Sequence, residues 1–149
     1  MTVEIKSTDD ITTAYGLTRE LMEHHNALDI FTMTAERFRE LIKTGILMSF
    51  TAYADGQPAG VMNAFYKYTT FTGRKIFYIE DLYIREKYRG CGIGGKLLDT
   101  AKKTASANDC GQIELKCAVW NENSAGFYKS HGLFPETDWQ VYTLDESLF

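Results

Sequence analysis

The stretch YRGCGIGGKLL, residues 88–98, carries the clearest chemical signature in the sequence. Its four glycines let the backbone curl so that successive N–H groups point at phosphate oxygens, and a helix that follows adds the partial positive charge of its N-terminus. The stretch fits three phosphate-binding patterns: G-x-G-x-x-G of dinucleotide sites, G-x-x-x-x-G-K of nucleotide P-loops, and R-x-x-G-x-G, which begins at Arg89. The sequence therefore predicts that this loop holds a phosphate-bearing ligand.

The residues around the loop weigh against two of these patterns. A P-loop needs Ser or Thr after its lysine to hold Mg²⁺, and Leu97 stands in that place. A dinucleotide site should follow its strand directly inside a βαβ unit, whereas residues 85–89 separate this loop from the preceding apolar run. Too few elements follow to build a doubly wound sheet. The R-x-x-G-x-G pattern therefore has the best support.

Two adjacent carboxylates interrupt the apolar run KIFYIEDLYI, residues 75–84. Burial alone does not explain a charged pair on a central strand. Because neighbouring side chains of a strand face opposite sides, we expect one of Glu80 and Asp81 to meet a ligand and the other to make a structural contact. A carboxylate in this place would attract a cationic ligand.

Hydrophobic periodicity predicts the elements that must position these residues, in the order β-α-α-β-β-β-α-β-α-β. The predicted strands are residues 3–7, 48–54, 59–68, 75–84, 113–119 and 139–144. The predicted helices are 11 to about 24, 34–44 before Gly45, 93 to about 108 before Gly111, and 123–131 before Gly132. Residues Ser7 to Asp10 offer several N-cap candidates for the first helix. This is a mixed α/β fold with an antiparallel first half.

Composition limits the class of protein. At 149 residues the chain has the size of one domain, and we expect a single domain over residues 1–149. A net charge of −4 disfavours a nucleic-acid partner, and no apolar run is long enough for a membrane helix. Three cysteines and three histidines match no metal-site spacing, so we expect no metal and a cytoplasmic protein with reduced thiols.

Two longer stretches carry a resemblance to a known family. IEDLYIREKYRGCGIGGKLL resembles motif A of the GCN5-related N-acetyltransferase (GNAT) superfamily, and AVWNENSAGFYKSHGL resembles its motif B. The likeness is strongest to the diamine (spermidine/spermine) and thialysine N-acetyltransferases, and it runs from about Ile76 to Phe149. It implies a GNAT fold with a mixed, mostly antiparallel central sheet and helices on both faces. It also implies acetyl-CoA as acyl donor, a small cationic amine as acceptor, and a homodimer.

The same resemblance assigns roles to individual residues. It implies two catalytic residues, Glu80 for deprotonation of the amine and Tyr128 for protonation of the leaving thiolate. The implied acetyl-CoA contacts are Leu82, Tyr83, Ile84, Arg89, Gly90, Cys91, Gly92, Ile93, Gly94, Gly95, Asn121, Ser124 and Tyr128. The implied acceptor contacts are Glu80, Asp81, His24 and His25. The reaction implied is direct attack of the amine in a ternary complex.

One segment departs from the polyamine subgroup. That subgroup carries acidic residues near the end of the first helix, and here the segment reads EHHN, with Glu23 the only carboxylate close by. A neutral histidine accepts a hydrogen bond from an ammonium, whereas a protonated one repels it. The acceptor therefore stays open between a polyamine, a diamine and a lysine-like amino acid. A protein N-terminal or lysine acetyltransferase and a non-catalytic acyl-CoA-binding module are the alternatives.

Overall fold

The computed structural model describes residues 1–7 and 9–149, and it divides into two compact units, Met1–Lys116 and Cys117–Phe149. The first unit is built on a five-stranded sheet with the order β1-β2-β3-β4-β5. Its strands are β1 (Val3–Ser7), β2 (Met48–Ala54), β3 (Gln57–Tyr68), β4 (Lys75–Ile84) and β5 (Cys110–Leu115). The first four strands pair antiparallel, and β5 pairs parallel with β4. The predicted mixed, mostly antiparallel sheet is confirmed.

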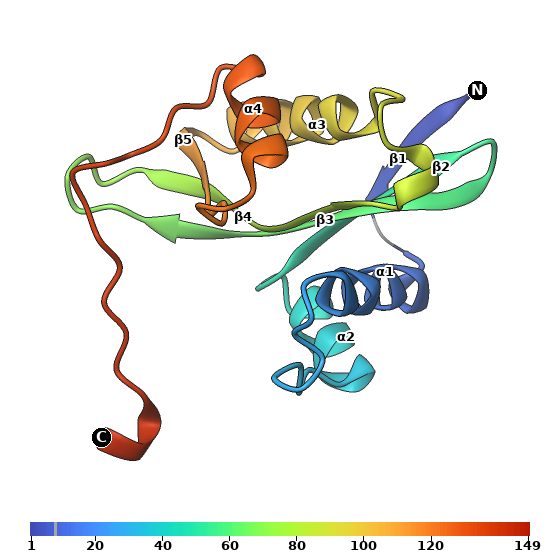
Figure 1. Ribbon diagram of the computed structural model, residues 1–149. Helices are drawn as coiled ribbons and strands as arrows, with labels where there is room; N and C mark the ends of the chain where they lie inside the picture. Colours follow the sequence, from blue (N-terminus) through green and yellow to red (C-terminus); the bar gives the residue numbers. More distant parts are fainter. Residues whose placement is uncertain (8) are drawn as a thin grey trace. The chain divides into compact units, whose positions relative to one another are not determined.

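Three helices of the first unit cover the two faces of this sheet (Figure 1). Helices α1 (Ile11–His24) and α2 (Ala35–Lys43) lie on one face, and α3 (Ile93–Ala107) lies on the other. Leu17 and Phe38 join Val61 of β3 in one buried cluster, all at most 1% exposed. On α3, the apolar residues that recur at helical spacing are all buried: Ile93, Leu97, Leu98, Ala101 and Ala105. This confirms the predicted α/β fold with helices on both faces.

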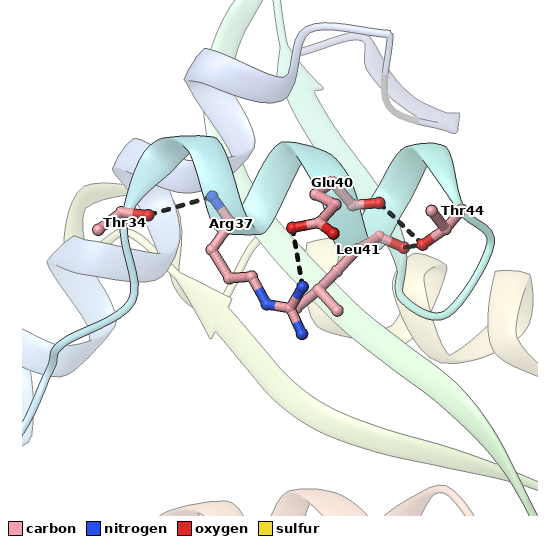
Figure 2. Close-up of polar contacts among 5 residues, drawn as sticks. All are labelled: Thr34, Arg37, Glu40, Leu41 and Thr44. Atoms are coloured by element: carbon pink, nitrogen blue, oxygen red, sulfur yellow. Dashed lines mark hydrogen bonds and ion pairs between the residues drawn. The ribbon is translucent and has the colours of Figure 1, made fainter.

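Side-chain caps fix where the first two helices begin. The Asp10 side chain accepts a hydrogen bond from the Thr13 N–H at 3.1 Å, so Asp10 is the N-cap among the predicted candidates. Of the other candidates, Thr8 lies outside the described residues. Thr34 caps α2 by accepting from the Arg37 N–H at 3.1 Å, as Figure 2 shows. Both caps satisfy N–H groups that a helix start otherwise leaves without a partner.

Helix α3 ends where the sequence predicts, but the residue that closes it differs from the prediction. The helix ends at Ala107 with Asn108 as C-cap, and Asp109 rather than a glycine takes the left-handed turn, with φ +55°. Gly111 therefore lies inside β5, which begins at Cys110 and ends at Leu115 instead of spanning 113–119. Asp tolerates this backbone region better than most residues, so no glycine is needed to close the helix.

The second unit contains α4 (Glu122–Ser130) and a 3-10 helix, Glu146–Leu148. The predicted last strand, 139–144, is wrong because its residues adopt no regular structure. Its apolar residues are left in water, with Trp139, Val141 and Tyr142 all more than 70% exposed. A run of strand-forming residues makes no strand by itself, because the backbone hydrogen bonds need a neighbouring strand and this unit offers none among its residues. No helix in the described parts of the chain is long and apolar enough to cross a membrane.

Candidate active site

A β-bulge places the two adjacent carboxylates on one side of the sheet. In the β3–β4 ladder Asp81 stands opposite Asn63 and Ile79 stands opposite Ala64, so Glu80 has no partner residue. An extra residue of this kind changes the direction of the side chains that follow it. Glu80 and Asp81 consequently line the same groove. The expectation that they face opposite sides is wrong, because strict alternation holds only in a regular ladder.

The groove belongs wholly to the first unit and has a volume of about 680 Å³. Its walls are largely apolar and come from α1, α2, the segment between them, and β3; they include Met22, Phe31, Met33, Phe38, Leu41 and Phe65. Glu80 and Asp81 are the only carboxylates among the described lining residues, and Arg37 is the only cation. Such a surface suits a ligand with a cationic group on an apolar body.

A buried chain of hydrogen bonds holds Asp81. The Asn63 amide nitrogen donates to Asp81 Oδ2 at 2.9 Å and to Thr18 Oγ1 at 2.8 Å. The Ser49 hydroxyl donates to Asn63 Oδ1 at 2.7 Å. Burial raises the pKa of Asp81 to about 6, the Asn63 hydrogen bond opposes this rise, and the Glu80 charge adds to it.

Arg37 stands at the first turn of α2, one face of which lines the groove. Its guanidinium makes a 2.8 Å ion pair with Glu40 on the same helix (Figure 2). Both side chains are more than half exposed, so this pair contributes little to stability. Arg37 remains the positive group on a wall that is otherwise apolar or hydroxylated.

The predicted acetyl-CoA contacts on β4 lie where the sheet opens. Pairing between β4 and β5 ends at Ile79 and Leu115, so within the first unit no strand flanks residues 80–84 on that side. The Arg85 N–H donates toward β3, to the Ala59 carbonyl at 2.9 Å. Because the main-chain groups of a strand alternate in direction, those of Leu82 and Ile84 point to the open side and those of Tyr83 toward β3. The Ile84 carbonyl accordingly accepts a bond from Arg89 Nε at 3.1 Å.

Two glycines of the loop adopt left-handed backbone conformations. Gly90 and Gly92 have φ +73° and +77°, and Gly92 is the N-cap of α3. The Ile93 side chain is buried in the core, which anchors the start of α3, whereas Cys91 is exposed. The first N–H groups of a helix have no partner within it, so those of Ile93, Gly94 and Gly95 suit a phosphate group.

The two adjacent histidines do not join the groove. His24 is the last residue of α1 and His25 is its C-cap, and both are exposed. The His24 ring lies 6.3 Å from the ring of Tyr83, centre to centre. Neither histidine is among the residues that line the groove. The predicted acceptor contacts are thus separated into the carboxylate pair in the groove and the histidine pair at the end of α1.

The remaining predicted residues lie in the second unit. Asn121 caps α4 by accepting a hydrogen bond from the Ser124 N–H at 3.1 Å. Tyr128 is half-buried and packs edge-on against Phe127, with ring centres 5.4 Å apart. Burial, and to a smaller degree the neighbouring Cys117, raises the pKa of Tyr128 to about 12. The Tyr128 hydroxyl therefore carries its proton at neutral pH.

The sequence prediction missed Asn63, Thr18 and the groove walls. An asparagine in the apolar run GVMNAF, residues 60–65, is the signal that points to a buried polar contact. Its partner Thr18 lies 45 residues away in the chain, which no local pattern indicates. Among the described residues no group of three or more His, Cys, Asp or Glu is placed to hold a metal ion.

Known proteins resemble both the sequence and the fold. A model described as the acetyltransferase (GNAT) family matches residues 15–133. Thialysine N-epsilon-acetyltransferase of Bos taurus is 31% identical over 126 residues, which cover 78% of this chain and 74% of that protein. Spermidine/spermine N(1)-acetyltransferase-like protein 1 of Homo sapiens is 28% identical over 141 residues, which cover 85% of this chain and 20% of that protein.

A solved structure supports the fold independently. The crystal structure of an aminoglycoside acetyltransferase from an uncultured soil metagenomic sample superposes with a TM-score of 0.82 at 16% identity, covering 96% of this chain and 97% of that one. At this identity the likeness concerns the fold alone. The family match covers most of the chain, including the β4 carboxylates, the glycine loop and α4. The chain therefore belongs to the acetyltransferase (GNAT) family and is an N-acetyltransferase.

Proposed function

We propose that the protein transfers acetyl from acetyl-CoA to a small cationic amine, namely a polyamine, a diamine or a lysine-like amino acid. The observation that carries this proposal is the groove, in which the described residues supply two carboxylates, Glu80 and Asp81, on otherwise largely apolar walls. An ammonium group entering the groove is attracted to these carboxylates, while the walls bury its hydrocarbon part. The thialysine acetyltransferase likeness supports an acceptor of this kind.

The residues expected to hold acetyl-CoA fit such a molecule. The left-handed Gly90 and Gly92 and the start of α3 suit its pyrophosphate, and the open side of β4 at Leu82 and Ile84 suits its pantetheine arm. Added Cβ atoms at these two glycines would meet nothing within 4 Å, so the loop leaves room beside its backbone. When bound, acetyl-CoA supplies an acetyl group activated as a thioester.

Side chains of the protein then transfer two protons. The carboxylate pair removes one from the acceptor ammonium, which frees the nitrogen lone pair for direct attack in a ternary complex. The Tyr128 hydroxyl, protonated at neutral pH because its pKa is about 12, donates the other to the leaving thiolate. Main-chain N–H groups at the open side of β4 stabilise the negative charge that develops on the thioester oxygen.

An acceptor panel tests this function. Release of free CoA thiol is measured with acetyl-CoA and, separately, spermidine, putrescine, lysine, thialysine and a short peptide. We expect turnover that saturates with at least one small amine. Turnover with the peptide alone would favour a protein acetyltransferase, and acetyl-CoA binding without turnover on any acceptor would favour a non-catalytic module.

We also propose a cytoplasmic homodimer. Apolar side chains are exposed through the C-terminal segment, among them Phe134, Trp139, Tyr142 and Phe149, each more than 70% exposed. A second copy that covers them would remove this surface from water. The described cysteines are all free thiols, which suits a reducing compartment. Light scattering on the purified chain tests the dimer, and a monomer at micromolar concentration would contradict it.

A further inference from the structure

We propose that Asn63 is a positioning residue, which holds Asp81 as the proton acceptor for the amine substrate. The inference rests on the proposed amine acetylation and goes beyond it by dividing the work of the two carboxylates. It stands on the hydrogen bonds around Asn63, which is 1% exposed in the floor of the groove between Thr18 of α1, Ser49 of β2 and Asp81 of β4.

The direction of each hydrogen bond follows from the donors present. The Thr18 hydroxyl has one proton, which it donates to the Ala14 carbonyl at 2.8 Å, so Thr18 Oγ1 must accept from Asn63 Nδ2. The Ser49 hydroxyl donates to Asn63 Oδ1. The orientation of the Asn63 amide is therefore fixed, and its second Nδ2 proton is directed at Asp81 Oδ2, 2.9 Å away.

This arrangement gives the two oxygens of Asp81 different tasks. Oδ2 accepts from Asn63, which fixes the plane of the carboxylate and favours its charged form. Oδ1 then remains to accept a proton from a ligand in the groove. Thr18 and Ser49 are 4% and 3% exposed, so the chain of bonds that supports Asn63 is shielded from water.

Asp81 and Glu80 lie in different chemical environments. Glu80 is exposed, whereas Asp81 is half-buried with a pKa of about 6, nearer to the working pH of a general base. The other charged groups lining the groove are Glu80 itself and Arg37 of α2, while α1 and β3 contribute the uncharged Thr18 and Asn63. Glu80 thus attracts the ammonium, and Asp81 takes its proton.

The proton transfer needs only the amine and Asp81. One N–H bond of the ammonium breaks, the nitrogen keeps the electron pair, and the proton binds Oδ1 of Asp81. The neutral carboxylic acid returns this proton to solvent after the amide product leaves. Asn63 takes no proton at any stage. Its effect must therefore appear in the pKa of Asp81 and not as a separate titration.

The test compares Asn63→Leu with Ser49→Ala. Asn63→Leu removes the donor to Asp81, whereas Ser49→Ala removes a hydrogen bond of the same amide and leaves that donor in place. Two quantities are measured. The first is the Asp81 carboxyl pKa, by ¹³C NMR titration without substrate. The second is the midpoint pH of the acid limb in the pH profile of kcat/KM, for one amine at saturating acetyl-CoA. Asn63→Asp is the second variant, because it keeps the side-chain size if Asn63→Leu fails to fold.

We expect Asn63→Leu to raise both the NMR pKa and the acid limb by about one pH unit, and Ser49→Ala, which loosens the amide but keeps its donor to Asp81, to raise both by less. Asn63→Asp, which also adds a charge, should raise them further. An unchanged NMR pKa in Asn63→Leu or Asn63→Asp overturns the positioning role. A changed NMR pKa with an unmoved acid limb overturns Asp81 as the proton acceptor. If the wild type acetylates no amine, the proposed function itself fails, while the NMR titration still decides whether Asn63 controls Asp81.

Discussion

The guanidinium of Arg85 donates two hydrogen bonds to the carboxylate of Glu20, from Nε at 2.9 Å and from Nη2 at 2.6 Å. Arg85 also donates from Nη1 to the Pro58 carbonyl at 2.8 Å. Glu20 lies on α1, which supplies Thr18 and Met22 to the groove, and Arg85 directly follows β4. The pair therefore connects the helix that lines the groove to the strand that leads into the glycine loop.

Arg85→Lys should destabilise the protein, because a lysine cannot reproduce the paired bonds of a guanidinium. We expect a loss of about 1 kcal/mol, which lowers Tm by about 2–4 °C in a differential scanning calorimetry experiment. Arg37→Lys is the matched control, because its pair with Glu40 is more exposed and lies within one helix. Equal decreases of Tm in the two variants would show that the Arg85–Glu20 pair stabilises the fold no more than the exposed Arg37–Glu40 pair does.

Asp81→Asn should stabilise the folded protein at pH 7 while it abolishes most acetyl transfer. The folded-state pKa of about 6 lies above the ordinary 3.8, so the native state binds this proton more tightly than the unfolded chain. The ionised carboxylate therefore destabilises the fold above pH 6, and this penalty disappears as the pH falls from 6 toward 3.8. Asparagine removes the charge, and we expect a gain of about 1–2 kcal/mol at pH 7.

Thermal unfolding of Asp81→Asn and the wild type at pH 7 and pH 4 measures this difference. The gain should be present at pH 7 and largely absent at pH 4, where the wild-type carboxyl is itself protonated in the folded state. A variant that is less stable than the wild type at pH 7 would contradict the view that Asp81 is held charged at a cost to stability.

Tyr128→Phe should lower kcat by about 10²–10⁴-fold, because it removes the proton donor for the leaving thiolate and keeps the aromatic contact with Phe127. The dissociation constant of acetyl-CoA, measured by calorimetry, should change little. The melting temperature serves as the control for folding. An unchanged kcat would remove Tyr128 from the mechanism.

Gly92→Ala should weaken acetyl-CoA binding, because φ +77° forces an alanine into a strained left-handed conformation. Relief of this strain moves the turn that opens α3, and we expect about tenfold weaker binding and a stability loss of about 1–2 kcal/mol. Gly16→Ala is the control, since Gly16 lies in α1 and an added Cβ meets nothing within 4 Å. That variant should be slightly more stable. Wild-type affinity in Gly92→Ala would show that the loop conformation is not needed.

Many of the features with a local sequence signal were predicted correctly. The glycine loop, the amphipathic helices and the first four strands follow from the order of small, apolar and polar residues, and they account for the position of Gly92 and of the β4 carboxylates. The bulge at Glu80 could not be predicted, because it depends on how β3 and β4 align. The Asn63–Thr18 contact likewise depends on the packing of α1 against the sheet. The strand expected at 139–144 failed because its pattern carries no information about a partner strand.

In the proposed mechanism, the carboxylate pair in the groove receives and deprotonates the amine. The most direct test is mass-spectrometric measurement of the acetylated amine made by the wild type and by the double variant Glu80→Gln, Asp81→Asn, with acetyl-CoA binding measured in the same samples. We expect a monoacetylated product from the wild type, at least 100-fold slower formation by the double variant, and equal affinity for acetyl-CoA. Undiminished product formation by the double variant would rule out this role of the carboxylate pair.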